Sequence, residues 1–269
     1  DEPAVRRAVG DLAADLERVT RKRPAVQQAA APKGTDLILV GTLGKSALID
    51  ALVAAGKLDL SPLKGQWEGW QIAAVAQPLP GVERALVIVG SDRRGTVYGI
   101  YELSEQIGVS PWTWWADVPV TQRTALYVPA GTRVQDAPVV RYRGIFLNDE
   151  APALTGWSKE KFGGYNSKFY AHVFELILRL RGNFIWPAMW GSAFFADDAK
   201  NGPLAEEYGV VIGTSHHEPL MRAHREWADA GGGPWDYNRN AERLRGFWQG
   251  GLAQSRGTER AFTLGMRGD

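Results

Sequence analysis

The stretch "RYRGIFLNDE", residues 141–150, decides the fold predicted for the second half of the chain. It reads as a short apolar strand that stops at an amide and two adjacent carboxylates, Asn148, Asp149 and Glu150. In a (β/α)8 barrel the strands are buried on both sides and the loops at their carboxyl ends carry the chemistry. If 141–150 is such a strand, the following sequence should repeat the same pattern.

The sequence after residue 150 does alternate between helical and strand-like patterns. Strands are predicted over 139–148, 183–190, 210–218 and 261–269, with helices over 167–182, 202–209 and 240–257. Four β/α units in a row fit the first half of a TIM-type (β/α)8 barrel over 139–269. An open doubly wound sheet would produce similar local patterns.

Polar and aromatic residues gather at the carboxyl ends of all four predicted strands. They are Asn148, Asp149 and Glu150 after the first, Trp186 and Trp190 around the second, Ser215, His216, His217 and Glu218 after the third, and Arg267 and Asp269 after the fourth. The carboxyl ends of parallel strands meet at one rim of a barrel, so these residues form the candidate site.

The sequence pattern of the first half of the chain predicts a separate α/β layer domain over 1–120. An amphipathic helix over 3–19 precedes strands at 36–41, 70–79 and 84–92, with further helices at 45–56 and 96–108. The strand at 36–41 reads as buried on both faces, because its apolar run is continuous. Residues 121–138 have turn residues between short β-like segments and no helical period, so we place the domain junction there.

Composition narrows the classes of partner. The net charge is +1, and no basic cluster exceeds "RKR" at 21–23, so a nucleic-acid partner is not expected. No apolar run approaches the ~18 to 20 residues that span a bilayer, and no signal-peptide layout is present. The chain contains no cysteine, which excludes disulfides and thiolate metal sites but leaves the compartment open. Its 11 tryptophans indicate a large core or a surface that stacks on flat ligands.

Two glycine-rich stretches resemble nucleotide-binding loops. "GTLGKS", residues 41–46, follows a strand and opens a helix, but a P-loop would require glycine at position 39, which is leucine. "GSDRRGTVYG", residues 90–99, lacks the dinucleotide spacing, and a helix start capped by Asp92 explains it better.

The candidate site residues also have structural interpretations. Adjacent histidines on a strand point to opposite faces, so His216 and His217 favour hydrogen bonding to a sugar, or a core role, over a shared metal site. Trp186 and Trp190 are four apart in a predicted strand, and could pack in the core or stack on a pyranose ring. Asp149 and Glu150 could cap the next helix or pair with an arginine. Arg267 could bind a substrate carboxylate through two parallel hydrogen bonds or pair with Asp269.

Several long motifs together resemble one enzyme family. The segments "GTLGKSALID", "GSDRRGTVYGIYELSEQIGVSPWTWWADVPV", "RYRGIFLNDEAP", "GGYNSKFYAHVFELILRLRGNFIWPAMW", "GVVIGTSHHEPL" and "GMRGD" are similar to glycoside hydrolase family 115, the xylan α-1,2-glucuronidases. The resemblance implies an inverting enzyme that removes glucuronic acid or its 4-O-methyl ether from glucuronoxylan or its oligosaccharides. It also implies an N-terminal α/β domain, a TIM-type barrel and further domains, so this chain would end in mid-barrel.

The resemblance also suggests roles for the site residues. Asp149, Glu150 and Asp269 are the expected catalytic carboxylates, although which is acid and which is base stays open, and a principal carboxylate is expected beyond Asp269. The expected substrate-binding residues are Asn148, Trp186, Trp190, His216, His217, Glu218 and Arg267. Protons and water suffice for such chemistry, so no metal or organic cofactor is expected.

The expected partner is a polysaccharide, with no nucleic acid or membrane. A homodimer, if formed, would use regions absent from this chain. A polymer cannot enter a cell intact, which implies a secreted or periplasmic protein. Two alternatives stay open, a carbohydrate-binding fragment without turnover and a glycosidase of another specificity, such as a hexosaminidase-type enzyme.

Overall fold

The computed structural model describes residues 2–28, 34 and 36–265, which form two compact units. The first unit contains the residues up to Arg141 together with Leu178–Leu180. The second contains Tyr142–Ile177 and the residues from Arg181 onward. Both units mix helices with sheets that contain parallel strands, so the expected α/β class is confirmed.

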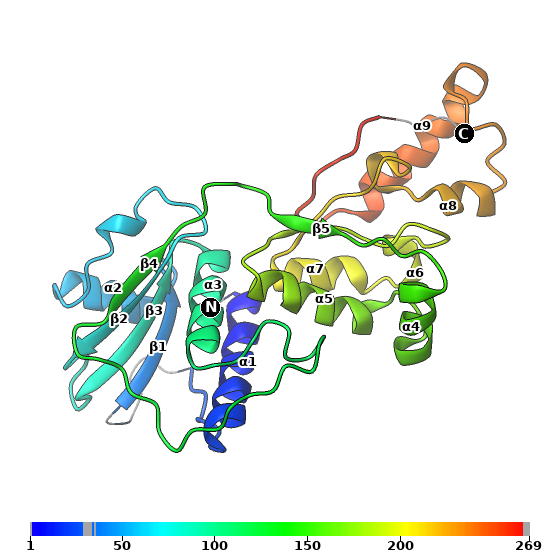
Figure 1. Ribbon diagram of the computed structural model, residues 1–269. Helices are drawn as coiled ribbons and strands as arrows, with labels where there is room; N and C mark the ends of the chain where they lie inside the picture. Colours follow the sequence, from blue (N-terminus) through cyan, green and yellow to red (C-terminus); the bar gives the residue numbers. More distant parts are fainter. Residues whose placement is uncertain (1, 29–33, 35, 266–269) are drawn as a thin grey trace. The chain divides into compact units, whose positions relative to one another are not determined.

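The first unit is built on a four-stranded sheet with helices on both faces (Figure 1). Its elements are α1 Pro3–Thr20, β1 Asp36–Thr42, α2 Ala47–Ala54, η1 Ser61–Leu63, β2 Trp70–Ala76, β3 Arg84–Gly90, α3 Arg93–Gln106 and β4 Arg133–Asp136. The strand order is β1-β3-β2-β4; β1 runs parallel to β3, while β2 is antiparallel to both β3 and β4. Helices α1 and α3 cover one face and α2 the other.

The predicted burial of β1 on both faces is wrong for its first half. β1 lies at the edge of the sheet, and Ile38 is exposed. The two central strands are buried on both faces: only Arg84 is exposed in β3, and only Ala76 in β2. Continuous apolar runs occur in both strands, so the run alone does not distinguish a central strand from an edge strand.

The glycines of the 90–99 stretch have packing reasons. A Cβ on Gly90 would lie 1.9 Å from the Thr96 backbone nitrogen, and a Cβ on Gly95 would lie 2.2 Å from the Gly69 carbonyl oxygen. The start of α3 therefore contacts neighbouring backbone directly, which only glycine allows. The predicted cap is confirmed, because Asp92 Oδ1 accepts a hydrogen bond from the Gly95 N–H at 2.9 Å.

Replacing Asp92 with alanine should destabilise the first unit. The second carboxylate oxygen accepts from the Glu68 N–H at 2.6 Å, so the variant leaves two backbone donors without their partner. We expect the free energy of unfolding to fall by about 2 kcal/mol in urea titrations. Gln106→Ala, an exposed change in the last turn of the same helix, should stay within about 0.5 kcal/mol of the wild type. Equal effects of the two changes would contradict the capping role.

The second unit contains three parallel strands, each followed by helices. Its elements are β5 Gly144–Phe146, α4 Ala153–Phe162, α5 Ser167–Arg179, β6 Phe184–Trp186, α6 Phe194–Asp197, α7 Asn201–Tyr208, β7 Val211–Ile212, η2 Pro219–Met221, α8 His224–Asp229 and α9 Tyr237–Gln254. The sheet order is β5-β6-β7, and a single parallel bridge joins Ile212 to Arg260. The first three predicted strands occur in the predicted order but are much shorter than predicted, and the fourth, predicted over 261–269, forms no strand over 261–265, the part of it that lies within the described residues.

Aromatic residues form the core beside this sheet. Tyr170 and Phe174 on α5 pack against Phe194 on α6, and Phe174 also contacts Tyr208 on α7. Figure 1 accordingly shows α5 and α7 side by side below β5. A second cluster, made of Trp227, Trp235, Leu244 and Phe247, joins α8 to α9. No helix among the described residues is both long enough and apolar enough to cross a membrane.

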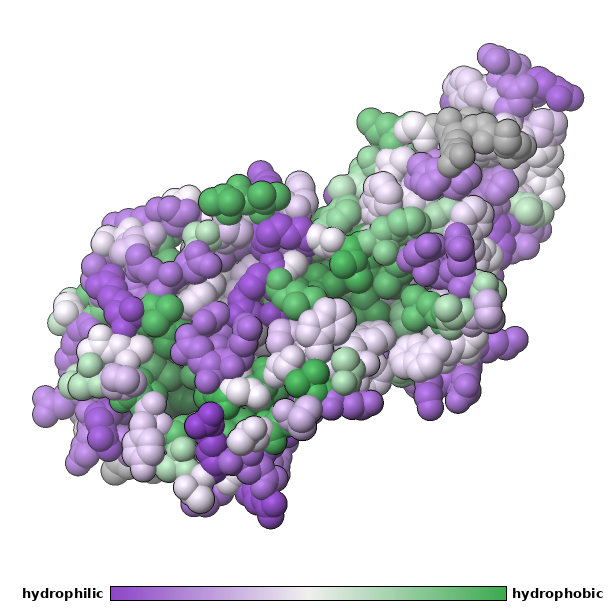
Figure 2. All heavy atoms as spheres, viewed as in Figure 1, coloured by the Kyte–Doolittle hydropathy of each residue, from purple (hydrophilic) through white to green (hydrophobic). Residues whose placement is uncertain are grey.

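The expectation that the strand at 139–148 is buried on both sides is wrong for β5. Ile145 and Phe146 are each 41% exposed. β5 is an edge strand, and within the described part of the chain it pairs only with β6. Figure 2 shows apolar atoms gathered over this strand. The apolar sequence predicted that this strand is covered on both faces, but the described residues leave Ile145 and Phe146 partly exposed.

Candidate active site

The loops that follow β5, β6 and β7 carry most of the predicted site residues. β5 and β6 are parallel neighbours, as are β6 and β7, so their carboxyl ends lie at one edge of the sheet. The three loops meet there directly. Ser215, after β7, places its Oγ 2.7 Å from the sulfur of Met189, after β6.

Asp149 is fully buried and its carboxylate links the loop after β5 to the loop after β6. Its Oδ1 accepts from the backbone N–H of Met189 and its Oδ2 from that of Trp190, both at 2.9 Å. Burial is the largest influence on this carboxyl and raises the pKa of Asp149, whereas the two N–H groups lower it. Because Asp149 follows β5 and the two amides follow β6, the carboxylate fixes the second loop relative to the first.

The rings of Trp190, His216 and His217 form a cluster in which Trp190 and His216 are exposed and His217 is half-buried. The two imidazole centroids are 4.3 Å apart, and that of His217 is 5.7 Å from the Trp190 ring. The expectation that the histidines point to opposite faces is wrong, because β7 ends at Ile212 and both lie in a turn. Trp190 likewise lies in a loop, because β6 ends at Trp186. The indole of Trp190 is 51% exposed, which leaves it accessible to a ligand.

Glu218 is the carboxyl group most altered by its surroundings. It is 4% exposed, and burial raises its pKa to about 8. A backbone hydrogen bond with Ser215 opposes the shift, while the negative charges of Glu226 and Asp149 add to it. At neutral pH the folded protein therefore keeps most of this carboxyl protonated.

Asn148 and Glu150 flank Asp149 but are exposed. Neither side chain makes a hydrogen bond or ion pair within the described part of the chain, so both are available to a ligand. Trp186 is half-buried and packs edge-on against Phe146 at 5.6 Å. Its indole lies against the residue that follows β7, where a Cβ on Gly213 would be 2.7 Å from Trp186 Nε1.

The remaining predicted residues, Arg267 and Asp269, lie outside the described residues. Within the described ranges no group of three or more His, Asp or Glu side chains is placed to hold a metal ion.

The glycine-rich loops of the first unit border a separate shallow cavity of about 270 Å³ at the ends of β1 and β3. Two hydroxyl groups of its lining already have partners within the protein: Thr42 Oγ1 lies 2.7 Å from Thr96 Oγ1, and Ser91 Oγ accepts from the Gly69 N–H at 3.0 Å. These contacts support the packing interpretation of both loops.

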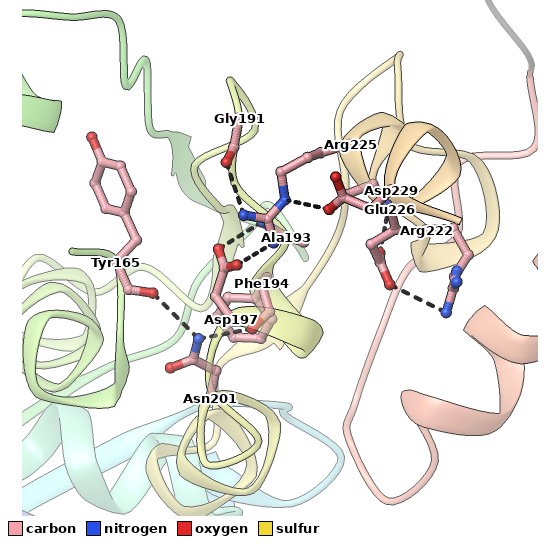
Figure 3. Close-up of polar contacts among 11 residues, drawn as sticks. Tyr165, Gly191, Ala193, Phe194, Asp197, Asn201, Arg222, Arg225, Glu226 and Asp229 are labelled. Atoms are coloured by element: carbon pink, nitrogen blue, oxygen red, sulfur yellow. Dashed lines mark hydrogen bonds and ion pairs between the residues drawn. The ribbon is translucent and has the colours of Figure 1, made fainter. Parts of the chain in front are cut away.

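Two residues that sequence reasoning did not select connect the site loops (Figure 3). Arg225, on α8, reaches the loop after β6, where it pairs with Asp197 and donates to the Gly191 carbonyl oxygen at 3.2 Å. The charge pattern of "HREWAD" signals a short helix with Arg225 and Asp229 one turn apart. The link to Asp197 has no comparable signal, since it joins positions 28 residues apart.

Comparison with known proteins places the chain in a family. The family model described as "Glycosyl hydrolase family 115" matches residues 135–269, half of the chain. The chain belongs to glycosyl hydrolase family 115. The resemblance noted in the sequence is thereby confirmed, and the matched residues include every candidate site position.

A solved family 115 structure matches the whole chain. It is described as "A novel family GH115 4-O-Methyl-alpha-glucuronidase, BtGH115A, with specificity for decorated arabinogalactans", with a TM-score of 0.86 and 36% sequence identity. The match covers 100% of this chain and 34% of that one, so this chain spans about a third of that protein's length. A second structure, described as a "GH138 enzyme targeting pectin rhamnogalacturonan II", has a TM-score of only 0.35 at 16% identity, over 73% of this chain and 26% of that one. A comparison with curated proteins found no match.

Proposed function

We propose that this chain is part of a glycoside hydrolase that removes α-1,2-linked glucuronic acid or 4-O-methylglucuronic acid from xylan. The observation that carries the proposal is the structural match over the entire chain to a family 115 4-O-methyl-α-glucuronidase. That relative is described as specific for decorated arabinogalactans. Our proposal keeps the same uronic acid but places it on xylan, so the identity of the polymer backbone is what the experiment must test.

The exposed side chains at the strand ends suit a sugar acid. Trp190 offers a flat apolar face to a pyranose ring, while the two imidazoles beside it offer hydrogen bonds to hydroxyl groups. Asn148 is exposed at the end of the neighbouring strand. Arg267 would bind the uronate carboxylate through two parallel hydrogen bonds.

An inverting mechanism needs a carboxylic acid and a carboxylate roughly 6.5 to 9.5 Å apart, with water between the carboxylate and the sugar. We assign one of these roles to Glu150, whose side chain is exposed, and the other to Asp269. Asp149 contributes by positioning, because both of its oxygens are engaged by backbone amides. We further propose that the second unit is the first half of a (β/α)8 barrel, which the parallel order β5-β6-β7 and the bridge from Ile212 to Arg260 support.

The test is release of free 4-O-methylglucuronic acid from glucuronoxylan and from glucuronate-decorated arabinogalactan. Both this chain and a polypeptide extended beyond Asp269 in the same gene would be assayed. We expect release from glucuronoxylan by the longer polypeptide, and its loss by at least about 100-fold in Glu150→Gln. Release from arabinogalactan alone would transfer the proposal to that polymer. Release from neither would refute it. A polymeric substrate also implies that the protein works outside the cytoplasm.

Carbohydrate binding without turnover is a second candidate, favoured by the exposed indole of Trp190. Affinity electrophoresis in xylan gels distinguishes it from catalysis by this chain. Retardation that survives Glu150→Gln but is lost in Trp190→Ala, without uronic acid release by any form of the protein, would support the binding role.

A further inference from the structure

The backbone around Trp190 is fixed by two charged side chains, one from the loop after β5 and one from helix α8. Its own N–H donates to Asp149, which follows β5. The carbonyl oxygen of the next residue, Gly191, accepts from Nη1 of Arg225, which follows β7. Trp190 itself follows β6, so three successive strand ends are connected through its backbone.

Arg225 can hold this loop because its guanidinium contacts three groups. Nη1 bonds the Gly191 carbonyl oxygen, Nη2 pairs with Asp197 Oδ1, and Nε lies 3.6 Å from Asp229 Oδ2 on its own helix (Figure 3). Asp197 uses its other oxygen to accept from the Ala193 N–H at 2.7 Å. The segment from Trp190 to Asp197, which ends with helix α6, is therefore held at its beginning, in its middle and at its end.

We propose that Arg225 and Asp197 are positioning residues that hold Trp190 ready to stack on the sugar ring. The inference rests on the proposed function for the identity of the sugar, but the positioning itself is a property of this chain. An exposed indole on a freely moving loop would lose conformational entropy when it binds a ligand. Fixing the backbone on both sides of Trp190 removes much of that loss before the ligand arrives.

The geometry predicts that a positive charge at position 225 is not sufficient to hold the backbone around Trp190. Lysine at position 225 keeps a positive charge but presents one nitrogen, which cannot reach Gly191, Asp197 and Asp229 together. Arg225→Lys should therefore restore only part of the protection from hydrogen exchange and of the substrate binding that Arg225→Met loses. Arg245→Met is a matched control, because Arg245 is exposed on α9 and its side chain has no hydrogen bond or ion pair within the described residues.

The first measurement is amide hydrogen exchange on this chain over residues 189–193. We expect exchange to accelerate at least about tenfold in Arg225→Met and in Asp197→Asn, and not in Arg245→Met. Unchanged exchange in the first two variants would overturn the positioning role. This result does not depend on enzymatic activity, so it remains decisive even if the wild type releases no uronic acid.

The second measurement is steady-state kinetics on the active, longer polypeptide with a 4-O-methylglucuronate-bearing oligosaccharide. Arg225→Met should raise KM about tenfold while kcat changes less than about threefold, because the loss falls on binding. Combined with Trp190→Ala, it should add little to the effect of Trp190→Ala alone, because Arg225 acts through that ring. Additive losses, or a KM equal to that of Arg245→Met, would overturn the inference. An inactive wild type would instead refute the proposed function.

Discussion

Replacing Asp149 with alanine is expected to lower the free energy of unfolding by about 2 to 4 kcal/mol, because two backbone donors lose their acceptor. The N–H groups of Met189 and Trp190 both point at this carboxylate, and Asp149 is fully buried. Asparagine should not rescue the protein. Its amide group would turn an N–H donor toward one of the two N–H groups, so Asp149→Asn should also be destabilised. Urea unfolding of this chain measures both variants.

The neighbouring carboxylate provides the matched control. Glu150 is exposed and its side chain makes no hydrogen bond within the described residues, so Glu150→Gln should unfold within about 0.5 kcal/mol of the wild type. Of these adjacent acids, Asp149 would then be needed for stability and Glu150 for the proposed release of uronic acid. Equal stability of the Asp149 and Glu150 variants would show that the two amides find other acceptors.

Glu218 should make the protein less stable as the pH rises. Burial raises the pKa of Glu218 from 4.5 to about 8 in the folded protein, so between these values the folded state binds a proton that the unfolded state has released. The free energy of unfolding should therefore fall by roughly 1 kcal/mol per pH unit from this group between about pH 5 and pH 8. Below pH 4.5 both states are protonated, and above pH 8 both are ionised, so the contribution is constant outside that window.

Glu218→Gln isolates this effect, because glutamine mimics the neutral acid at every pH. The stability of the variant relative to the wild type should rise steadily from about pH 5 to pH 8 in urea titrations. Glu242→Gln, an exposed change on α9, should show a flat difference over the same range. A flat difference for Glu218→Gln as well would mean that water reaches the carboxyl in solution.

The helices α1, α2 and α3 and the strands β1, β2 and β3 could be predicted closely because their sequence patterns are strong, whereas β4 lies within 121–138, where the domain junction was predicted. Asp92 was even recognisable as a cap, since aspartate before a helix has a local reason to be there. In the second unit the helices α5, α7 and α9 were predictable, but the lengths of the strands were overestimated. Apolar residues such as those of "NFIWPAMW" continue beyond β6 into a loop, where they pack without strand pairing.

The candidate residues were predictable by type and by position at strand ends, but not by environment. Asp149 and Glu150 are adjacent in sequence, yet one is buried against two amides and the other faces solvent. That difference depends on where the loop after β6 passes, which no local pattern encodes. The pair of Arg225 and Asp197 was missed for the same reason, because the two residues meet only when α6 and α8 come together in the folded chain.

The contacts of Asp149 also bear on how loops could be exchanged within family 115. A loop after β6 taken from a relative would arrive with its own backbone path, and its amides would have to meet a carboxylate that belongs to the preceding strand. A loop graft that omits position 149 would leave the backbone N–H groups at positions 189 and 190 without their carboxylate acceptor. The loops after β5 and β6 are therefore one module, and substrate preference should be transferred by grafting both together.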